Sequence, residues 1–333
     1  MILEGLVSVV VINYNSGDFI FKCLEHVKKQ TYPHIEILVI DNNSQDGSGQ
    51  RLDELSKNQD IAYFHYGENM GSSRANNIGI EKSQGEYILI LNADVFLEND
   101  YVEKCVKGFG KDLAIGTVVG KFLSAREKSI IDSAGIILFK EGVGNERGSG
   151  EKDHGQYDKE EFIVGACCAA VMYKRKMLQA IRYRREYYDE DFFAFVEDLD
   201  LSVRSILLGW KTYYCPSAVA YHVRGGSVKP NNRFIAYLNY RNHEYFYLKT
   251  YRTVDVSSWI SRKVLKIIRI ITIKKSFKTQ CRKEMRKVEK RLLEKRLYFS
   301  PRCHERYLKP YLRKSYIISN FKHRIMRRII MPQ

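Results

Sequence analysis

The sequence contains neither a disulfide framework nor a long apolar segment. It has seven cysteines, an odd number, and no Cys-x-x-Cys pair, so neither a set of disulfides nor a zinc ribbon is indicated. No uncharged apolar stretch reaches the roughly 18–20 residues that cross a bilayer. The N-terminus lacks a basic region and a cleavage-like site, and its apolar run at 7–12 is only as long as a strand. We therefore expect a cytoplasmic protein with reduced thiols, soluble or peripheral at the inner face of the cell membrane.

Several widespread enzyme motifs are missing as well. The sequence has no P-loop, no Gly-x-Gly-x-x-Gly, no Gly-x-Ser-x-Gly and no His-Glu-x-x-His. These absences argue against kinases, Rossmann dehydrogenases, α/β-hydrolases and zincins. No internal repeat is apparent, and a composition of 44% hydrophobic and 28% charged residues is that of an ordinary globular protein.

Charge is distributed unevenly along the chain. The formal net charge is +16, but residues 229–333 hold 29 of the 55 Lys and Arg and only 6 of the 39 Asp and Glu. This segment therefore carries +23, and residues 1–228 carry −7. The difference predicts an acidic main domain over 1–228 and a basic, mostly helical C-terminal extension over 229–333.

Apolar strands and helices alternate in the first hundred residues. The pattern predicts strands at 7–12, 35–40, 61–66 and 87–91, and helices at 19–27 and 74–82. Alternation at this spacing indicates an α/β fold with a mainly parallel sheet flanked by helices. Further along we expect a surface loop or lid at 141–160, a helix at 198–209 and a strand at 212–215.

Carboxylates stand where two of these strands end. Asp41 follows the second strand and Asp94 follows the fourth. A single aspartate at such a place usually forms a turn or caps a helix, but two at one edge of a parallel sheet face the same crevice. His222 together with Asp94 would supply the mixed nitrogen and oxygen ligation that suits Mn²⁺ and that Mg²⁺ tolerates beside a diphosphate.

A second group of carboxylates follows the aromatic run 192–196. An apolar environment raises a carboxyl pKa toward the range useful for a general base. Asp198 is a candidate for this role or for a helix cap, and we expect Asp200 to cap the helix that begins there.

Seven ordered segments resemble family 2 glycosyltransferases with the GT-A fold, particularly the rhamnosyltransferase-like branch. The segments are 9–16 (VVVINYNS), 39–48 (VIDNNSQDGS), 68–79 (ENMGSSRANNIG), 85–95 (GEYILILNADV), 189–204 (DEDFFAFVEDLDLSVR), 209–210 (GW) and 220–227 (AYHVRGGS). The resemblance implies a hexosyltransferase that moves a sugar, with inversion, from a nucleotide-diphosphate sugar to an acceptor hydroxyl. It implies a dTDP-rhamnose-like donor or a UDP-sugar, and a glycan or polyprenyl-linked acceptor. No Gln-x-x-Arg-Trp motif follows, which argues against a processive polysaccharide synthase.

The resemblance also implies roles in donor binding. Tyr14 and Asp41 match positions that hold the nucleotide base. Gly71 and Asn76 match the lining of the nucleotide and sugar pocket, and Arg74 matches a phosphate contact.

Metal and catalytic roles follow in the same way. Asp94 corresponds to the last acid of an Asp-x-Asp motif that binds a divalent cation, Mg²⁺ or Mn²⁺, and the diphosphate. Asn92 replaces the first acid, so the cation has one fewer charged ligand. His222 matches a metal or diphosphate contact, and Asp198 matches the catalytic base of a Glu-Asp motif.

Three interpretations of the basic extension stay open. Residues 259–275 have apolar and basic faces at helical spacing, which predicts a helix lying on an anionic membrane; basic clusters follow at 282–296 and 324–328. The alternatives are a helical hairpin packed on the catalytic domain and, less expected, nucleic-acid binding through phosphates. For the whole chain, the alternative function is a non-catalytic nucleic-acid or membrane-surface binding protein on a degenerate GT-A domain, a reading that Asn92 favours.

Overall fold

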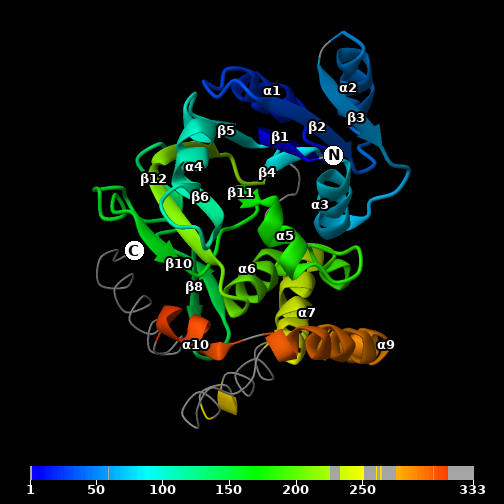
Figure 1. Ribbon diagram of the computed structural model, residues 1–333. Coiled ribbons are helices and arrows are strands. Elements are labelled where there is room, and N and C mark those ends of the chain that lie inside the picture. The colour runs from blue at the N-terminus through cyan, green and yellow to red at the C-terminus, as the bar shows by residue number, and fades with distance from the viewer. Residues whose placement is uncertain are drawn as a thin grey trace, which may run out of the picture.

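A ten-stranded sheet forms the centre of the protein. The structure, a computed structural model, describes residues 2–58, 60–225, 233–250, 260, 263–264, 275–302 and 304–313 (Figure 1). The strand order is β10-β12-β6-β11-β4-β1-β2-β3, with β5 paired to β12 and β7 to β6. The strands are β1 (Leu3–Asn13), β2 (Ile35–Asp41), β3 (Ile61–His65), β4 (Gly85–Asn92), β5 (Val95–Leu97), β6 (Ile115–Ser124), β7 (Ile131–Ser133), β10 (Glu161–Ile163), β11 (Ala170–Lys174) and β12 (Lys211–His222).

The predicted parallel sheet is confirmed in its N-terminal half. β1 pairs in parallel with β2 and β4, and β2 pairs in parallel with β3. Val9, Val10 and Val11 of β1 are fully buried, as expected for a strand covered on both faces. β11 enters between β4 and β6 as an antiparallel strand, and β12 runs parallel to β6.

Helices flank this sheet (Figure 1). α3 packs over β1 and β2, and α4 packs over β6 and β12. Gly79 of α3 permits a close approach, because a Cβ there would lie 2.2 Å from a methyl carbon of Val10. The helices of the body are α1 (Phe19–Lys28), α2 (Ser48–Ser56), α3 (Gly71–Lys82), α4 (Tyr101–Phe109), α5 (Arg175–Ile181) and α6 (Glu197–Leu207).

The described part of the C-terminal extension packs against α6. It contains α7 (Arg233–Thr250), α9 (Lys275–Phe299), α10 (Glu305–Leu308) and the short strand β13 (Leu312–Arg313). Tyr245, Phe246, Leu292 and Leu308 from these elements share one apolar cluster with Val203 of α6 and its neighbours. β13 pairs with β8 (Ile136–Phe139), which pairs with β9 (Gly144–Glu146) in a small second sheet. Of the three interpretations of the extension, the helical hairpin packed on the main domain agrees with the described residues 233–250, 275–302 and 304–313.

Two local predictions differ from the structure. The stretch 141–160 is not a loop throughout, because Gly144–Glu146 forms β9 against β8. The strand predicted at 212–215 extends to His222, because β6 pairs with it along most of its length. Pro216 is tolerated where the register shifts between Cys215 and Val219, since a ladder hydrogen bond is already missing there.

The amphipathic helix predicted over 259–275 and the basic cluster at 324–328 lie outside the described residues, apart from isolated positions. Within the described ranges, no helix has both the length and the apolarity required to cross a membrane.

Candidate active site

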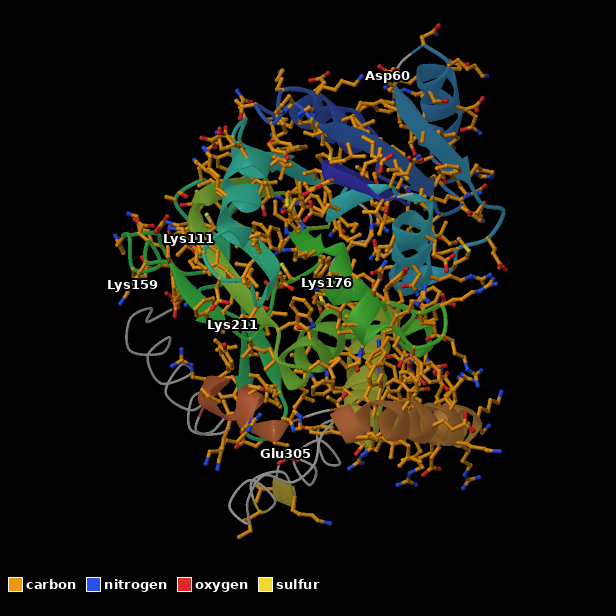
Figure 2. All side chains as sticks on the ribbon, viewed as in Figure 1. Asp60, Lys111, Lys159, Lys176, Lys211 and Glu305 are labelled. Carbon is orange, nitrogen blue, oxygen red and sulfur yellow. The ribbon has the colours of Figure 1, made fainter. Side chains whose placement is uncertain are left out.

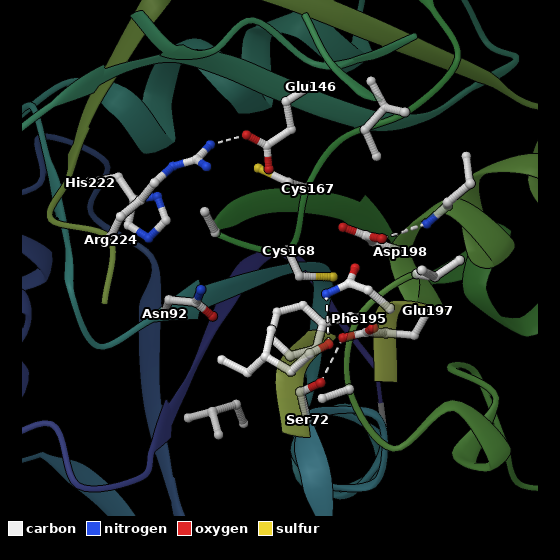
Figure 3. A pocket seen from close by; sticks show the side chains of 18 of the residues that line it. Ser72, Asn92, Glu146, Cys167, Cys168, Phe195, Glu197, Asp198, His222 and Arg224 are labelled. Atoms are coloured by element: carbon white, nitrogen blue, oxygen red, sulfur yellow. Dashed lines mark hydrogen bonds and ion pairs between the residues drawn. The ribbon is translucent and has the colours of Figure 1, made fainter. Parts of the chain in front are cut away.

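A cavity of about 670 Å³ lies at the carboxyl ends of β1 and β4 (Figure 3). It is lined by side chains from the sheet edge, from the start of α6 and from α7. Six residues singled out in the sequence line it together: Tyr14, Asn76, Asn92, Asp94, Asp198 and His222. His222 lies on one side of the cavity and Asp198 on the opposite side (Figure 3).

His222 joins two carboxylates. Its Nε2 lies 3.4 Å from Oδ1 of Asp94, and its Nδ1 lies 2.9 Å from Oδ2 of Asp132 in β7. Burial opposes a charge on the imidazole, but Asp132 and Asp94 outweigh this effect and raise the pKa of His222 to about 9. The bond to Asp132 fixes the orientation of the ring, so that Nε2 faces Asp94.

The arginine in the cavity lining is Arg224, whereas the sequence pointed to Arg74. The guanidinium of Arg224 contacts the carboxylate of Glu146 (Figure 3), and it also contacts that of Asp132. Arg74 is exposed on α3 and does not belong to the lining. A phosphate group in this cavity would therefore find its guanidinium partner on the loop after β12.

Asp198 and Glu197 occupy the first turn of α6. Asp198 is half-buried and accepts a hydrogen bond of 2.7 Å from the backbone N–H of Leu199. Glu197 is buried and accepts a hydrogen bond of 2.6 Å from Ser72 Oγ. Burial raises the pKa of Asp198, and burial together with the charge of Asp198 raises the pKa of Glu197. The sequence predicted the raised pKa of Asp198, because the aromatic run precedes it.

Asp200 is not a helix cap. It lies inside α6, whose N-cap residue is Val196, and it is fully buried. Its carboxylate accepts hydrogen bonds from Arg204 Nε at 2.8 Å and from Lys249 Nζ at 2.7 Å. The capping prediction was wrong because a partner from α7, far along the chain, supplies the counter-charge.

Asp41 and Gly71 also lie outside the lining. Asp41 is fully buried, and its carboxylate accepts hydrogen bonds from Asn13 Nδ2, Ser44 N and Tyr63 Oη. Gly71 has φ +78°, and a Cβ there would lie 2.3 Å from the carbonyl oxygen of Phe193. Their predicted roles in donor binding stay predictions.

Three further lining residues carry no sequence pattern that points to a binding site. Ile235, Asn239 and His243 of α7 follow one another at four-residue spacing and line the cavity. They belong to the extension, whose composition marked it only as basic. Ser72 and Glu197, in contrast, lie within segments that the family resemblance covers.

The donor set at Asp94 and His222 fits a divalent cation in part. Within the described ranges, no three or more His, Cys, Asp and Glu side chains are arranged to hold a metal ion. A carboxylate oxygen and an imidazole nitrogen 3.4 Å apart would supply two ligands, and diphosphate oxygens and water would supply the others. Ligation needs the neutral imidazole, so a bound cation and the Nε2 proton exclude one another.

Comparison with solved structures supports the GT-A fold. The mannosyltransferase PcManGT from Pyrobaculum calidifontis, in complex with GDP-Man and Mn²⁺, superposes with a TM-score of 0.53 at 14% identity, covering 88% of this chain and 87% of that chain. GalNAc-T7, solved with UDP, GalNAc and Mn²⁺, gives a TM-score of 0.55 at 17% identity and covers 78% of this chain. The predicted GT-A fold is confirmed.

Sequence comparison identifies the family. Glycosyltransferase GlyA of Streptococcus pneumoniae serotype 4 is 28% identical over 239 residues, which are 68% of this chain and 32% of that protein. The chain thus spans about a third of the length of that relative. Residues 8–182, more than half of the chain, match the model of Glycosyl transferase family 2. The chain belongs to glycosyl transferase family 2.

Proposed function

We propose that this chain is an inverting glycosyltransferase that moves a sugar from a nucleotide-diphosphate sugar to an acceptor hydroxyl. One observation carries the proposal: Asp198 and the pair Asp94 and His222 line opposite sides of one cavity at the strand ends. Inverting transfer needs a base on the acceptor side and positive charge at the diphosphate, and this arrangement separates the two.

Asp198 is the proposed general base. Its carboxylate is half-buried beside the cavity, and its raised pKa makes it a stronger proton acceptor than an exposed aspartate. It would take the proton of the acceptor hydroxyl as the oxygen attacks the anomeric carbon. The neighbouring Glu197 carboxylate also lines the cavity, but it already accepts a 2.6 Å hydrogen bond from Ser72 Oγ.

Asp94 and His222 are the proposed ligands of Mg²⁺ or Mn²⁺. A cation bound there would supply neutralisation of the charge that develops on the leaving diphosphate. Asp132 keeps the imidazole in place, and Arg224 adds a cationic group beside it. Tyr14, Asn76 and Asn92 line the same cavity and are proposed to contact the donor.

The donor is proposed to be dTDP-rhamnose-like or a UDP-sugar, as in the rhamnosyltransferase-like branch, and the acceptor a lipid-linked or cell-surface glycan. An exposed basic face on α9 supports a membrane-bound acceptor. Its members are Arg282, Lys283, Arg286, Lys287 and Lys290. Exposed Leu293, Leu297 and Tyr298 continue along the same helix, and such a mixture of basic and apolar groups binds anionic lipid surfaces.

The proposal is tested in two steps. Thermal stabilisation by nucleoside diphosphates, each with Mg²⁺ or Mn²⁺, identifies the base that the cavity binds. Transfer from the matching nucleotide sugar is then compared between the wild type and Asp198→Asn. Loss of a general base lowers kcat by about 10²–10⁴-fold, while the nucleoside diphosphate Kd should stay unchanged. An Asp198→Asn variant that keeps most of the activity would remove Asp198 from the base role.

A further inference from the structure

The loop before the proposed base has an unfavourable backbone conformation. Phe193, Phe195 and Val196 have φ values of +66°, +70° and +71°. Residues with side chains rarely adopt this region, and a β-branched valine there is a pronounced outlier. Glu197 and Asp198 follow directly, so the direction in which their carboxylates point depends on this loop. Surrounding contacts must hold such a conformation.

One amide group in the extension makes those contacts. Asn242 of α7 is fully buried, and its Nδ2 lies 2.9 Å from the carbonyl oxygen of Phe192, 2.7 Å from that of Ala194 and 2.7 Å from that of Phe195. Two N–H hydrogens are thus shared among three carbonyls that converge on one point. Carbonyls in such a loop need donors, and the Asn242 side chain reaches all three of them. The neighbouring Arg241 of α7 adds a second donor to only one of these carbonyls, that of Phe192, at 2.8 Å.

The fourth carbonyl of this stretch, that of Phe193, is held by α3. The backbone N–H of Ser73 donates a 3.0 Å hydrogen bond to the carbonyl oxygen of Phe193. Gly71 makes this approach possible, because any Cβ at that position would collide with the same oxygen. The carbonyls of 192–195 are therefore all fixed, three by α7 and one by α3.

We infer that Asn242 is a positioning residue, which holds the 193–196 loop in the conformation that turns Asp198 toward the cavity. The extension then completes the active site, because α7 also lines the cavity with Ile235, Asn239 and His243. This inference rests on the proposed function for the role of Asp198, but the conformation of the loop can be measured without it.

The test compares two variants of α7 in the full chain. Asn242→Leu keeps a side chain of similar volume and removes both N–H hydrogens. Leu238→Ala, one turn earlier and equally buried, leaves a cavity in the same helix and removes no bond to the loop. Three quantities are measured: hydrogen exchange of the amides of 193–198, the nucleoside diphosphate Kd, and kcat of transfer.

Asn242→Leu is expected to accelerate exchange at 193–198 and to lower kcat by about tenfold or more, with Kd changed by less than about twofold. Leu238→Ala is expected to lower the melting temperature while kcat and loop exchange stay near wild type. Asn242→His, which keeps one N–H donor, should recover part of kcat and also serves if Asn242→Leu does not fold.

Equal loss of kcat in Asn242→Leu and Leu238→Ala, in proportion to their melting temperatures, would overturn the inference, as would unchanged loop exchange in Asn242→Leu. Failure of the proposed function gives a different result. Wild-type protein would then transfer no sugar from any donor, while exchange at 193–198 would still respond to Asn242 and not to Leu238.

Discussion

Asp198 owes its proposed reactivity to where its carboxylate lies. Burial beside the cavity raises its pKa above the ordinary aspartate value, and its charge in turn helps to raise the pKa of the adjacent, buried Glu197. A base must be ionised to accept a proton, so activity is present above the raised pKa and is lost as the pH falls through it.

We therefore expect the acidic limb of kcat against pH to lie above the ordinary aspartate range, falling about tenfold per pH unit below its midpoint. Initial rates at saturating donor from pH 4 to 9 measure it, with nucleoside diphosphate binding followed over the same range as control. A limb near the pKa of an exposed aspartate would contradict the assigned environment.

Gly71 is a second residue whose effect the structure predicts. A Cβ at this position meets the carbonyl oxygen of Phe193 at 2.3 Å, and φ is +78°. Gly71→Ala should therefore lower the free energy of unfolding by about 1–3 kcal/mol and lower kcat as well, because the loop before Asp198 must shift. Gly67→Ala is the matched control, since a Cβ there meets nothing within 4 Å. Denaturant unfolding and transfer rates distinguish the two, and equal behaviour would argue against the close contact.

Part of the site followed from residue type and order, and the family resemblance added the rest. Asp94 follows β4 and His222 ends β12, so both lie at strand ends beside the cavity. Tyr14 and Asn76, in contrast, were identified through the resemblance alone. The sequence could not reveal Asp132, because an aspartate in a short apolar strand carries no pattern that links it to a histidine 90 residues away. Such pairs depend on strand register, which is a property of the whole sheet.

At the scale of elements, a buried ion-pair network joins the extension to the body. Lys295 of α9 is 1% exposed, and its Nζ lies 2.7 Å from Glu186, 2.5 Å from Asp189 and 2.9 Å from Asp191. Lys249 of α7 contacts Asp189 from the other side at 2.7 Å. Burial alone would raise the pKa of Asp189, but the two lysines outweigh it and lower that pKa.

Removing Lys295 should therefore be costly. Lys295→Met leaves three carboxylates near one another with a partner missing, which should lower the free energy of unfolding by about 3–5 kcal/mol. Lys290→Met, on the exposed face of α9, should change it by less than about 0.5 kcal/mol. Urea unfolding of both variants measures this. A small effect at Lys295 would mean that α9 does not need this network to stay in place.

At the scale of the whole molecule, the two charged parts meet through these pairs. The acidic segment 186–200 lies against Lys249 and Lys295 of the extension. Other basic side chains of α9 are exposed on its outer side, where Figure 2 shows side chains with terminal nitrogens projecting away from the body. On its inner face, the basic charge of α9 pairs with the acidic body and holds the extension against it. On its outer face, the basic side chains stay exposed and can contact a polyanion.

Removing the charges on the outer face of α9 tests whether this face binds an anionic membrane. Replacing Arg282, Lys283, Arg286, Lys287 and Lys290 by Gln should abolish co-sedimentation with vesicles that contain anionic lipid, since each contributes about 1 kcal/mol near such a surface. Transfer to a water-soluble acceptor should stay unchanged. The matched control replaces five exposed lysines of the body, Lys22, Lys28, Lys29, Lys159 and Lys176. Equal losses in both variants, or binding that ignores the lipid charge, would contradict a role for α9.

Local pattern specified the strands of the parallel sheet and the candidates Asp94, Asp198 and His222. The family resemblance added Tyr14, Asn76 and Asn92. A short, β-branched, continuous apolar run between turn residues favours a strand covered on both faces. Tertiary structure decided three other features: Arg224 rather than Arg74 lines the cavity, Asp200 pairs with Lys249, and Asn242 holds the loop before Asp198. The first feature places the loop after β12 at the cavity, and the last two join groups about 50 residues apart in the chain. The distance between them is set by packing, which no local pattern records.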